Sequence, residues 1–232
     1  MNPQIIIAMA VAPGIFWLWY FYQRDTLEPE PRGQVLKIFL WGAFSALPAI
    51  FLEIPFGGLS LLSTVVVAPL VEELCKFYVV KTKIYDHDEF DEPMDGIVYG
   101  TAAALGFASA ENILYLMAAY YAPESLNLSG SAVSSLWSTF VLRAVLSVPG
   151  HALWGAIWGY ALGLAKFGAP RTVIGTGVVL AILLHGAFNF LVSTHLLMGL
   201  GLFVLIPLMW GMVNRRIAVS LRHSPHRDSP KL

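Results

Sequence analysis

Residues 68–80 read APLVEELCKFYVV, an apolar segment that contains two adjacent glutamates, Glu72 and Glu73, and a lysine, Lys76. The apolar run around it covers residues 58–80, and a membrane-crossing helix needs roughly 20 such residues. An ionised side chain near the centre of a bilayer costs about 2.5–3.5 kcal/mol. The segment therefore predicts a membrane helix whose charged side chains meet polar partners or line a water-filled cavity.

The rest of the chain has the same membrane-protein character. Of its 232 residues, 57% are apolar and 12% are charged, whereas a soluble domain is roughly 25% charged. The pattern predicts an all-α polytopic bundle over residues 1–214, followed by a disordered basic cytoplasmic tail over residues 215–232. The expected membrane helices, about seven in number, are residues 3–22, 35–54, 58–80, 95–121, 133–165, 172–193 and 195–213.

The distribution of basic residues predicts an orientation. Every Lys and Arg outside these helices falls in an alternate connection or in the tail, so the positive-inside rule puts the N-terminus outside and the C-terminus in the cytoplasm. The net charge of -1 gives no signal for nucleic-acid binding. The expected surroundings are therefore the lipid bilayer and membrane proteins, and the sequence leaves the oligomeric state open.

More polar side chains lie inside the predicted helices. They are Glu111, Asn112, Arg143, His151, His185 and Asn189. Unpaired, these groups and the charged ones of residues 68–80 would cost more than roughly 10 kcal/mol, so we expect them to meet one another. Two histidines with several carboxylates can hold a divalent ion such as Zn²⁺ and activate water. Neither HExxH nor HxxEH occurs, so the ligands would come from different helices.

Structural interpretations of the same residues stay open at this point. Glu72 with Lys76, or Glu111 with Arg143, can be a purely structural ion pair, and Asn112 and Asn189 can be hydrogen-bonding links between helices. Two further features concern packing. Pro69 leaves a backbone carbonyl without its usual donor, which a neighbouring group must satisfy. The glycines of GHALWGAIWGYALG (150–163) form a smooth stripe that allows another helix to approach closely.

Four motifs in this order resemble the PrsW family of intramembrane proteases, which is similar in motif layout to the CAAX-prenyl endopeptidases and bacteriocin-processing membrane proteases. The motifs are VEELCKF, GFASAEN, GHALWGAIWGYALG and HGAFN, within residues 64–190. The CAAX-type pattern has a histidine at the position of Glu111 and prefers arginine at the position of Lys76. Both differences favour the PrsW branch.

The resemblance implies a metal-dependent intramembrane endopeptidase of a prokaryotic cell membrane. Its substrate would be a membrane-associated protein, such as an anti-sigma-factor-like regulator. By matching position, Glu111, His151 and His185 would hold the metal, alone or together with one of the paired glutamates, and Zn²⁺ or a similar divalent ion is expected. Glu72, Glu73 and Asn189 would be catalytic, and we expect Glu72 to be the general base. Lys76, Asn112 and Arg143 would support the site.

Other functions remain possible from the residues alone. Paired membrane carboxylates also suit a transporter that couples to protons or ions, although no inverted repeat is visible. A non-catalytic membrane scaffold would use the same groups as structural pairs. A serine or cysteine protease would need Ser109, Ser147 or Cys75 beside a histidine, and no GxSxG turn accompanies them.

Overall fold

The computed structural model describes residues 1–194 and 201–227, and every regular element in these ranges is helical. The α-helices are α1 (Pro3–Tyr22), α2 (Arg32–Glu53), α3 (Ser60–Leu62), α4 (Ala68–Lys83), α5 (Pro93–Tyr121), α6 (Ala132–Leu142), α7 (Val148–Lys166), α8 (Thr172–Ser193) and α10 (Ile206–Arg222). Short 3-10 or π turns lie between some of them, namely η1 (Ile54–Leu59), η2 (Ser63–Val67), η3 (Pro123–Leu126), η4 (Arg143–Ser147) and η5 (Gly201–Leu205). The predicted all-α class is confirmed.

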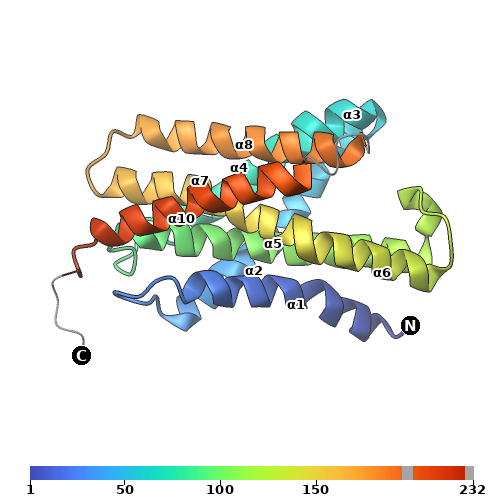
Figure 1. Ribbon diagram of the computed structural model, residues 1–232, viewed down its shortest axis with the longest axis horizontal. Coiled ribbons are helices and arrows are strands. Elements are labelled where there is room, and N and C mark those ends of the chain that lie inside the picture. Colours follow the sequence, from blue (N-terminus) through green and yellow to red (C-terminus); the bar gives the residue numbers. More distant parts are fainter. Residues whose placement is uncertain (195–200, 228–232) are drawn as a thin grey trace.

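The long helices lie along one axis, with α5 in the middle of the bundle and α1 and α8 on opposite sides (Figure 1). Helix α5 packs against α1, α2 and α7, and α7 packs against α8. The α1–α2, α4–α5 and α7–α8 connections and the end of α10 gather at one end, called here the basic end because it carries most of the Lys and Arg residues. The N-terminus and α3 lie toward the other end.

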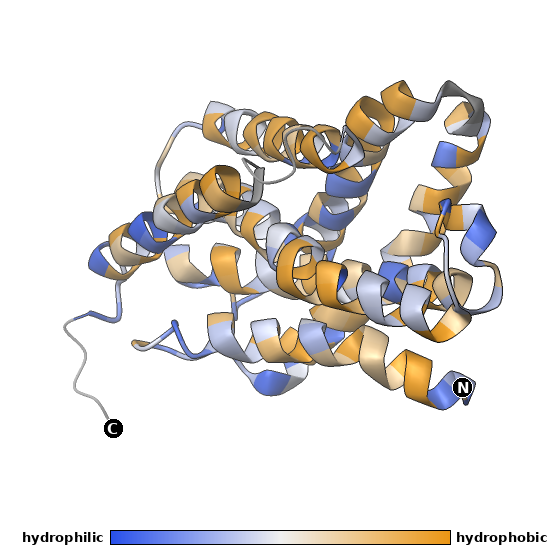
Figure 2. Cartoon of the chain, turned by 45° about the vertical axis from the view of Figure 1, so that its right-hand side comes forward, coloured by the Kyte–Doolittle hydropathy of each residue, from blue (hydrophilic) through white to orange (hydrophobic). Residues whose placement is uncertain are grey.

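Within the described residues, six helical segments are long and apolar enough to cross a membrane. They are Pro3–Tyr22, Arg32–Gly57, Pro93–Tyr121, Ala132–Lys166, Thr172–Ser193 and Phe203–Arg222. Figure 2 shows hydrophobic residues along most of these helices and hydrophilic residues mainly at their ends. The segment that was predicted as the third span is also helical, from Ser60 to Lys83, but its charged residues keep it outside this apolar class. The orientation stays a prediction.

The C-terminal part differs from the predicted boundaries. Residues 195–200, where the last helix was expected to begin, lie outside the described residues. Helix α10 continues to Arg222, so residues 215–222 are helical where a disordered tail was predicted. Met209, Val213, Ile217 and Ser220 are all buried. Their spacing of three or four residues gives α10 one inward face, and Arg215 and Arg216 lie between these positions.

Three π turns each end two residues before a proline, with η2 before Pro69, η4 before Pro149 and η5 before Pro207. A proline ring clashes with the carbonyl four residues earlier in an α-helix, and a wider π turn relieves that clash. In η2 the amide of Ala68 therefore donates to Ser63, five residues back. Pro149 is thus accommodated by a π turn inside one continuous helix, Ala132–Lys166.

Glycines bring α5 and α7 into backbone contact. A Cβ atom added to Gly159 would lie 2.1 Å from the carbonyl oxygen of Gly96, and one added to Gly155 would lie 2.6 Å from that of Gly100. Gly163 approaches Pro93 in the same way, with 2.3 Å to its carbonyl oxygen. The predicted close-packing stripe is confirmed for these three positions of α7.

We expect Gly159→Ala to lower the free energy of unfolding by about 1–3 kcal/mol, because the added methyl group meets rigid backbone. Gly175→Ala in α8 is the matched control, since nothing lies within 4 Å of its added Cβ. The control should be neutral or stabilising, because alanine favours a helix over glycine by about 0.5–1 kcal/mol. Thermal unfolding in detergent measures both, and equal changes for the two variants would contradict the close contact.

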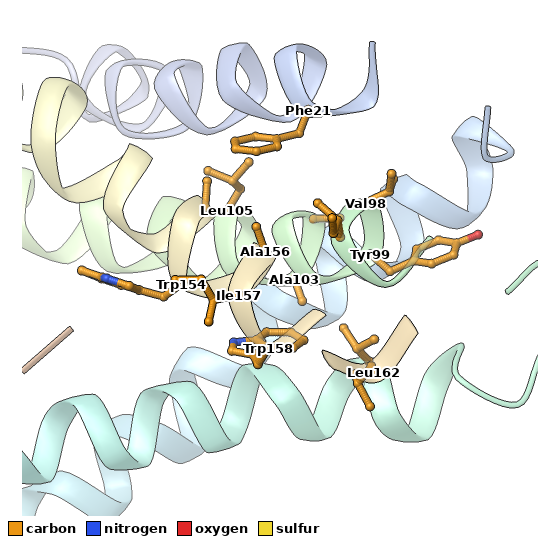
Figure 3. Close-up of a cluster of buried hydrophobic side chains, with 14 of the residues drawn as sticks. Phe21, Val98, Tyr99, Ala103, Leu105, Trp154, Ala156, Ile157, Trp158 and Leu162 are labelled. Atoms are coloured by element: carbon orange, nitrogen blue, oxygen red, sulfur yellow. The ribbon is translucent and has the colours of Figure 1, made fainter. Parts of the chain in front are cut away.

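The core lies mainly between α5 and α7 and includes two large side chains of α7, Trp154 and Trp158 (Figure 3). Both are fully buried. Trp158 lies over the ribbon of α4 in Figure 3, and Phe77 of α4 packs edge-on against its ring with 5.8 Å between centroids. These tryptophans connect the apolar core with the polar residues of α4.

Candidate active site

Polar side chains from four helices meet inside the bundle and form what is called here the polar cluster. Its members are Glu72, Glu73 and Lys76 of α4, Glu111 of α5, His151 of α7 and His185 of α8. All are buried except Glu111, whose side chain is 20% exposed. The sequence therefore correctly predicted that these residues meet.

Lys76 lies at the centre of the polar cluster and is fully buried. Its Nζ is 3.0 Å from Glu72 Oε2, 2.9 Å from Glu73 Oε1 and 2.9 Å from His151 Nδ1. A protonated lysine has three N–H donors and no acceptor, so three acceptors saturate it. Lys76 thus holds both glutamates of α4 and orients one histidine of α7.

Glu73 is fully buried, and both of its oxygens are engaged. Oε1 accepts from Lys76 and lies 3.0 Å from His185 Nδ1, while Oε2 accepts from Trp158 Nε1 at 3.0 Å. A carboxylate that accepts from one imidazole nitrogen leaves the other nitrogen with a lone pair. This arrangement fixes the tautomer of His185 with Nε2 unprotonated, as in histidines that bind metal ions.

The two tryptophans of α7 were missed as site residues by sequence reasoning. The Trp154 ring stacks on the His185 ring, with 3.7 Å between centroids and 10° between planes, while Trp158 holds Glu73. Residues 151, 154 and 158 recur on one helical face, and that spacing is the signal that could have linked both tryptophans to His151. They hold the polar groups at fixed rotations.

Glu111 forms a second charged group next to His151. Its Oε2 is 2.6 Å from Arg143 Nη2 and 3.2 Å from His151 Nε2. Asn112 accepts from Arg143 Nε at 2.5 Å and donates to the carbonyl of Ala10 at 3.2 Å. Arg143 thus points into the bundle and pairs with Glu111, and Asn112 links α5 with α1, as its structural interpretation predicted.

Asn189 contacts the backbone near Pro69. Its Nδ2 donates to the carbonyl of Thr64 at 2.9 Å. In the π register of η2 this carbonyl would accept from residue 69, and Pro69 has no N–H. Asn189 therefore satisfies the carbonyl that the proline was predicted to leave free. Gly186 allows this contact, because an added Cβ there would lie 2.5 Å from the carbonyl oxygen of Val65.

Three members of the polar cluster offer ligand atoms around one point. One ligand atom each of Glu72, His151 and His185 lies within 4.8 Å of the other two, and all three residues are buried. The expected set of Glu111, His151 and His185 is not grouped in this way among the described residues; Glu111 is bound to Arg143 instead. The donor types, two imidazoles and one carboxylate, suit a divalent ion such as Zn²⁺.

Comparison with known proteins decides between the functions that the sequence left open. The model of the PrsW family of intramembrane metalloproteases matches residues 30–212. The chain belongs to this family. It is 36% identical to Protease PrsW of Geobacillus kaustophilus over 91% of this chain and 90% of that protein. It is 35% identical to Protease PrsW of Bacillus subtilis over 81% and 83%, respectively. No solved structure gives a significant match.

Membership of the PrsW family makes this chain a multi-pass membrane protease of a prokaryotic cell. The transporter and scaffold alternatives are therefore set aside. The structure also gives no support to a nucleophile at Ser109 or Cys75. Ser109 donates to the carbonyl of Leu105 in its own helix, and Cys75 packs with Phe107 and the alanines of α2.

Proposed function

We propose that this PrsW-family protein is a zinc-dependent endopeptidase that hydrolyses a peptide bond of a membrane-associated protein at the polar cluster. The observation that carries the proposal is the meeting of Glu72, His151 and His185, with ligand atoms within 4.8 Å of one another. The second support is the contact of Glu73 with His185, which prepares the free imidazole nitrogen for an ion.

His151 and His185 are the residues that would hold the ion, with Glu72 beside them. His185 has an unprotonated Nε2 for this purpose, whereas His151 would exchange one of its two partners, Lys76 or Glu111. A bound Zn²⁺ lowers the pKa of a coordinated water towards 7 and polarises a carbonyl group. The remaining chemistry falls to side chains of the chain itself.

Glu72 is the carboxylate with a free oxygen. Its Oε2 accepts from Lys76, while no donor in the described residues occupies Oε1. We therefore assign Oε1 of Glu72 to take the proton of the attacking water and to deliver it to the leaving amine. Glu73 cannot share this task without losing His185 or Trp158, so its role is to position His185.

We expect Glu73→Gln to reduce turnover only in part. A glutamine at this position still accepts hydrogen bonds, but it lacks the negative charge that faces Lys76 and His185. Residues that hydrogen-bond to metal-binding histidines typically contribute about 10–100-fold to metal affinity or enzymatic activity. Turnover and zinc affinity should fall together within that range. A loss of turnover with unchanged zinc affinity would contradict the positioning role.

The depth of the polar cluster supports a substrate segment that enters the membrane. Along α4, Glu72 is about 16 Å from Lys83 at the basic end, and along α7, His151 is about 22 Å from Lys166, at 1.5 Å per residue. Both values fall within a hydrocarbon layer of about 30 Å. An anti-sigma-factor-like regulator with a single membrane helix is the substrate that we propose.

The proposal is tested by cleavage in proteoliposomes that contain the purified protein and such a single-pass substrate. We expect cleavage that is lost after a zinc chelator, restored by Zn²⁺ and insensitive to serine-reactive and thiol-reactive probes. His185→Ala should abolish it, whereas His223→Ala, an exposed histidine after α10, should not. Full cleavage after verified removal of the metal would overturn the proposal.

A further inference from the structure

A second group of carboxylates lies at the basic end of the bundle and is called here the acidic cluster. Asp25 and Glu30 come from the α1–α2 connection, Glu92 precedes α5, and Asp95 lies in the first turn of α5. All four are at least 97% buried, since their exposed fractions are 3% for Asp25 and 0% for the others. Such burial is unusual for carboxylates without partners.

Part of the acidic cluster already has hydrogen-bond donors. Asp95 Oδ2 accepts from the backbone amides of Asp91 and Glu92, at 2.6 and 2.7 Å. Glu30 Oε2 accepts from the hydroxyl of Tyr99, and the hydroxyl of Tyr22 donates to the carbonyl of Glu30 at 3.0 Å. These contacts hold Glu30 and Asp95 in fixed positions, so the cluster is an ordered part of the fold.

Other oxygens of the acidic cluster have no partner. Both side-chain oxygens of Asp25, Oε1 of Glu30 and Oδ1 of Asp95 are buried without a hydrogen bond in the described part of the chain. No ion pair to any of the four carboxylates occurs there either. Burial and the neighbouring Glu92 raise the pKa of Asp25 to about 9, and burial and Asp95 raise the pKa of Glu30 to about 11. No cationic side chain of the described residues pairs with the acidic cluster.

We propose that the acidic cluster binds one hard divalent cation, Ca²⁺ or Mg²⁺, at a site separate from the polar cluster. One oxygen each of Asp25, Glu92 and Asp95 lies within 4.8 Å of the others. The unpartnered Oε1 of Glu30 supplies a further buried ligand atom beside them. Oxygen atoms are the ligands that Ca²⁺ and Mg²⁺ prefer, whereas Zn²⁺ favours histidine and cysteine.

The size of the cluster fits such an ion. Opposite ligands of one ion are separated by twice the metal–oxygen distance, which is roughly 4.2 Å for Mg²⁺ and 4.6–5.2 Å for Ca²⁺. The ligand atoms of the acidic cluster lie within 4.8 Å of one another, which is compatible with ligands of one such ion. The ion would join the α1–α2 connection to the beginning of α5. Its effect is therefore to stabilise the basic end of the bundle, independently of the proposed proteolysis.

Calorimetric titration of the purified full chain in detergent with Ca²⁺ and, separately, Mg²⁺ tests this site. We expect saturable binding of about one ion, and a rise in Tm of about 5–10 °C at 100 times Kd. Asp25→Asn and Glu30→Gln should each weaken binding at least about 10-fold. Asp88→Asn, an exposed residue of the neighbouring α4–α5 connection, is the matched control and should bind as wild type does.

Two further comparisons make the result decisive. His185→Ala should keep this binding, because the polar cluster is not involved. In ion-free buffer Asp25→Asn should be about as stable as wild type or more so, because the raised pKa of Asp25 leaves its carboxyl group uncharged at neutral pH, as the amide is. The proposal is overturned by absence of saturable Ca²⁺ and Mg²⁺ binding to wild type, by wild-type affinity in both cluster variants, by loss of binding in His185→Ala, or by a lower ion-free Tm of Asp25→Asn.

Discussion

Replacing Glu72 by glutamine is expected to lower turnover at least about 10³-fold while the protein stays folded. General-base catalysis typically contributes about 10²–10⁴-fold, and a glutamine amide cannot take the proton of water. Glutamine has the same shape, and its side-chain oxygen can still accept from Lys76, so the packing of α4 should persist. Turnover in proteoliposomes, thermal unfolding and zinc content are measured on the same preparation.

The control for this variant is Glu124→Gln, a change of the same chemistry at an exposed residue of η3. It should have wild-type turnover. We expect Glu72→Gln to keep most of its zinc, because His151 and His185 remain and the amide oxygen can still face the ion. Normal turnover in folded Glu72→Gln would contradict the assignment of the base. Complete loss of zinc in this variant would instead show that Glu72 is a metal ligand and not the general base.

Replacing Lys76 by methionine is expected to lower the free energy of unfolding by about 3–5 kcal/mol. Removing one partner of a buried ion pair leaves an uncompensated charge, and here two carboxylates, Glu72 and Glu73, lose the same cation. Methionine has a similar length and can keep the contact of the side chain with Phe107. Thermal or denaturant unfolding in detergent measures the change.

Lys83→Met is the matched control, because Lys83 lies in the same helix and is exposed. Its effect should stay within about 0.5 kcal/mol, as is usual for surface substitutions. Adding Glu73→Gln to Lys76→Met should recover part of the loss, because one of the two unpaired charges is then removed. Equal stability of the two lysine variants would mean that Lys76 does not compensate the buried carboxylates.

Much of the fold follows from the sequence because membrane helices require long apolar segments. The helical segments, the glycine contacts between α5 and α7 and the unsatisfied carbonyl near Pro69 were all predictable from local rules of sterics and hydrogen bonding. The end of α10 was not, because Arg215 and Arg216 suggested a loop. The helix continues because Val213, Ile217 and Ser220 recur at helical spacing and are buried, although charged residues lie between them.

The detailed pairing within the site could not be derived from sequence. The rotation and depth of each helix decide whether Glu72 or Glu111 lies beside the two histidines, and packing across helices determines both. Trp154 and Trp158 gave no signal by themselves, because tryptophans are common in apolar helices. The acidic cluster was hidden for a related reason. Acidic residues in a connection suggest a solvated loop, and only the packing of two connections against α5 buries them.

The central claim is that His151 and His185 hold a catalytic metal ion beside Glu72. The most direct test is the zinc content of the purified, folded protein, measured by elemental analysis for wild type, His185→Ala and the control His223→Ala. We expect about one zinc ion per chain in wild type and in His223→Ala, and almost none in His185→Ala. Equal zinc content in all three proteins, or a fully active wild-type protein without bound metal, would contradict the claim.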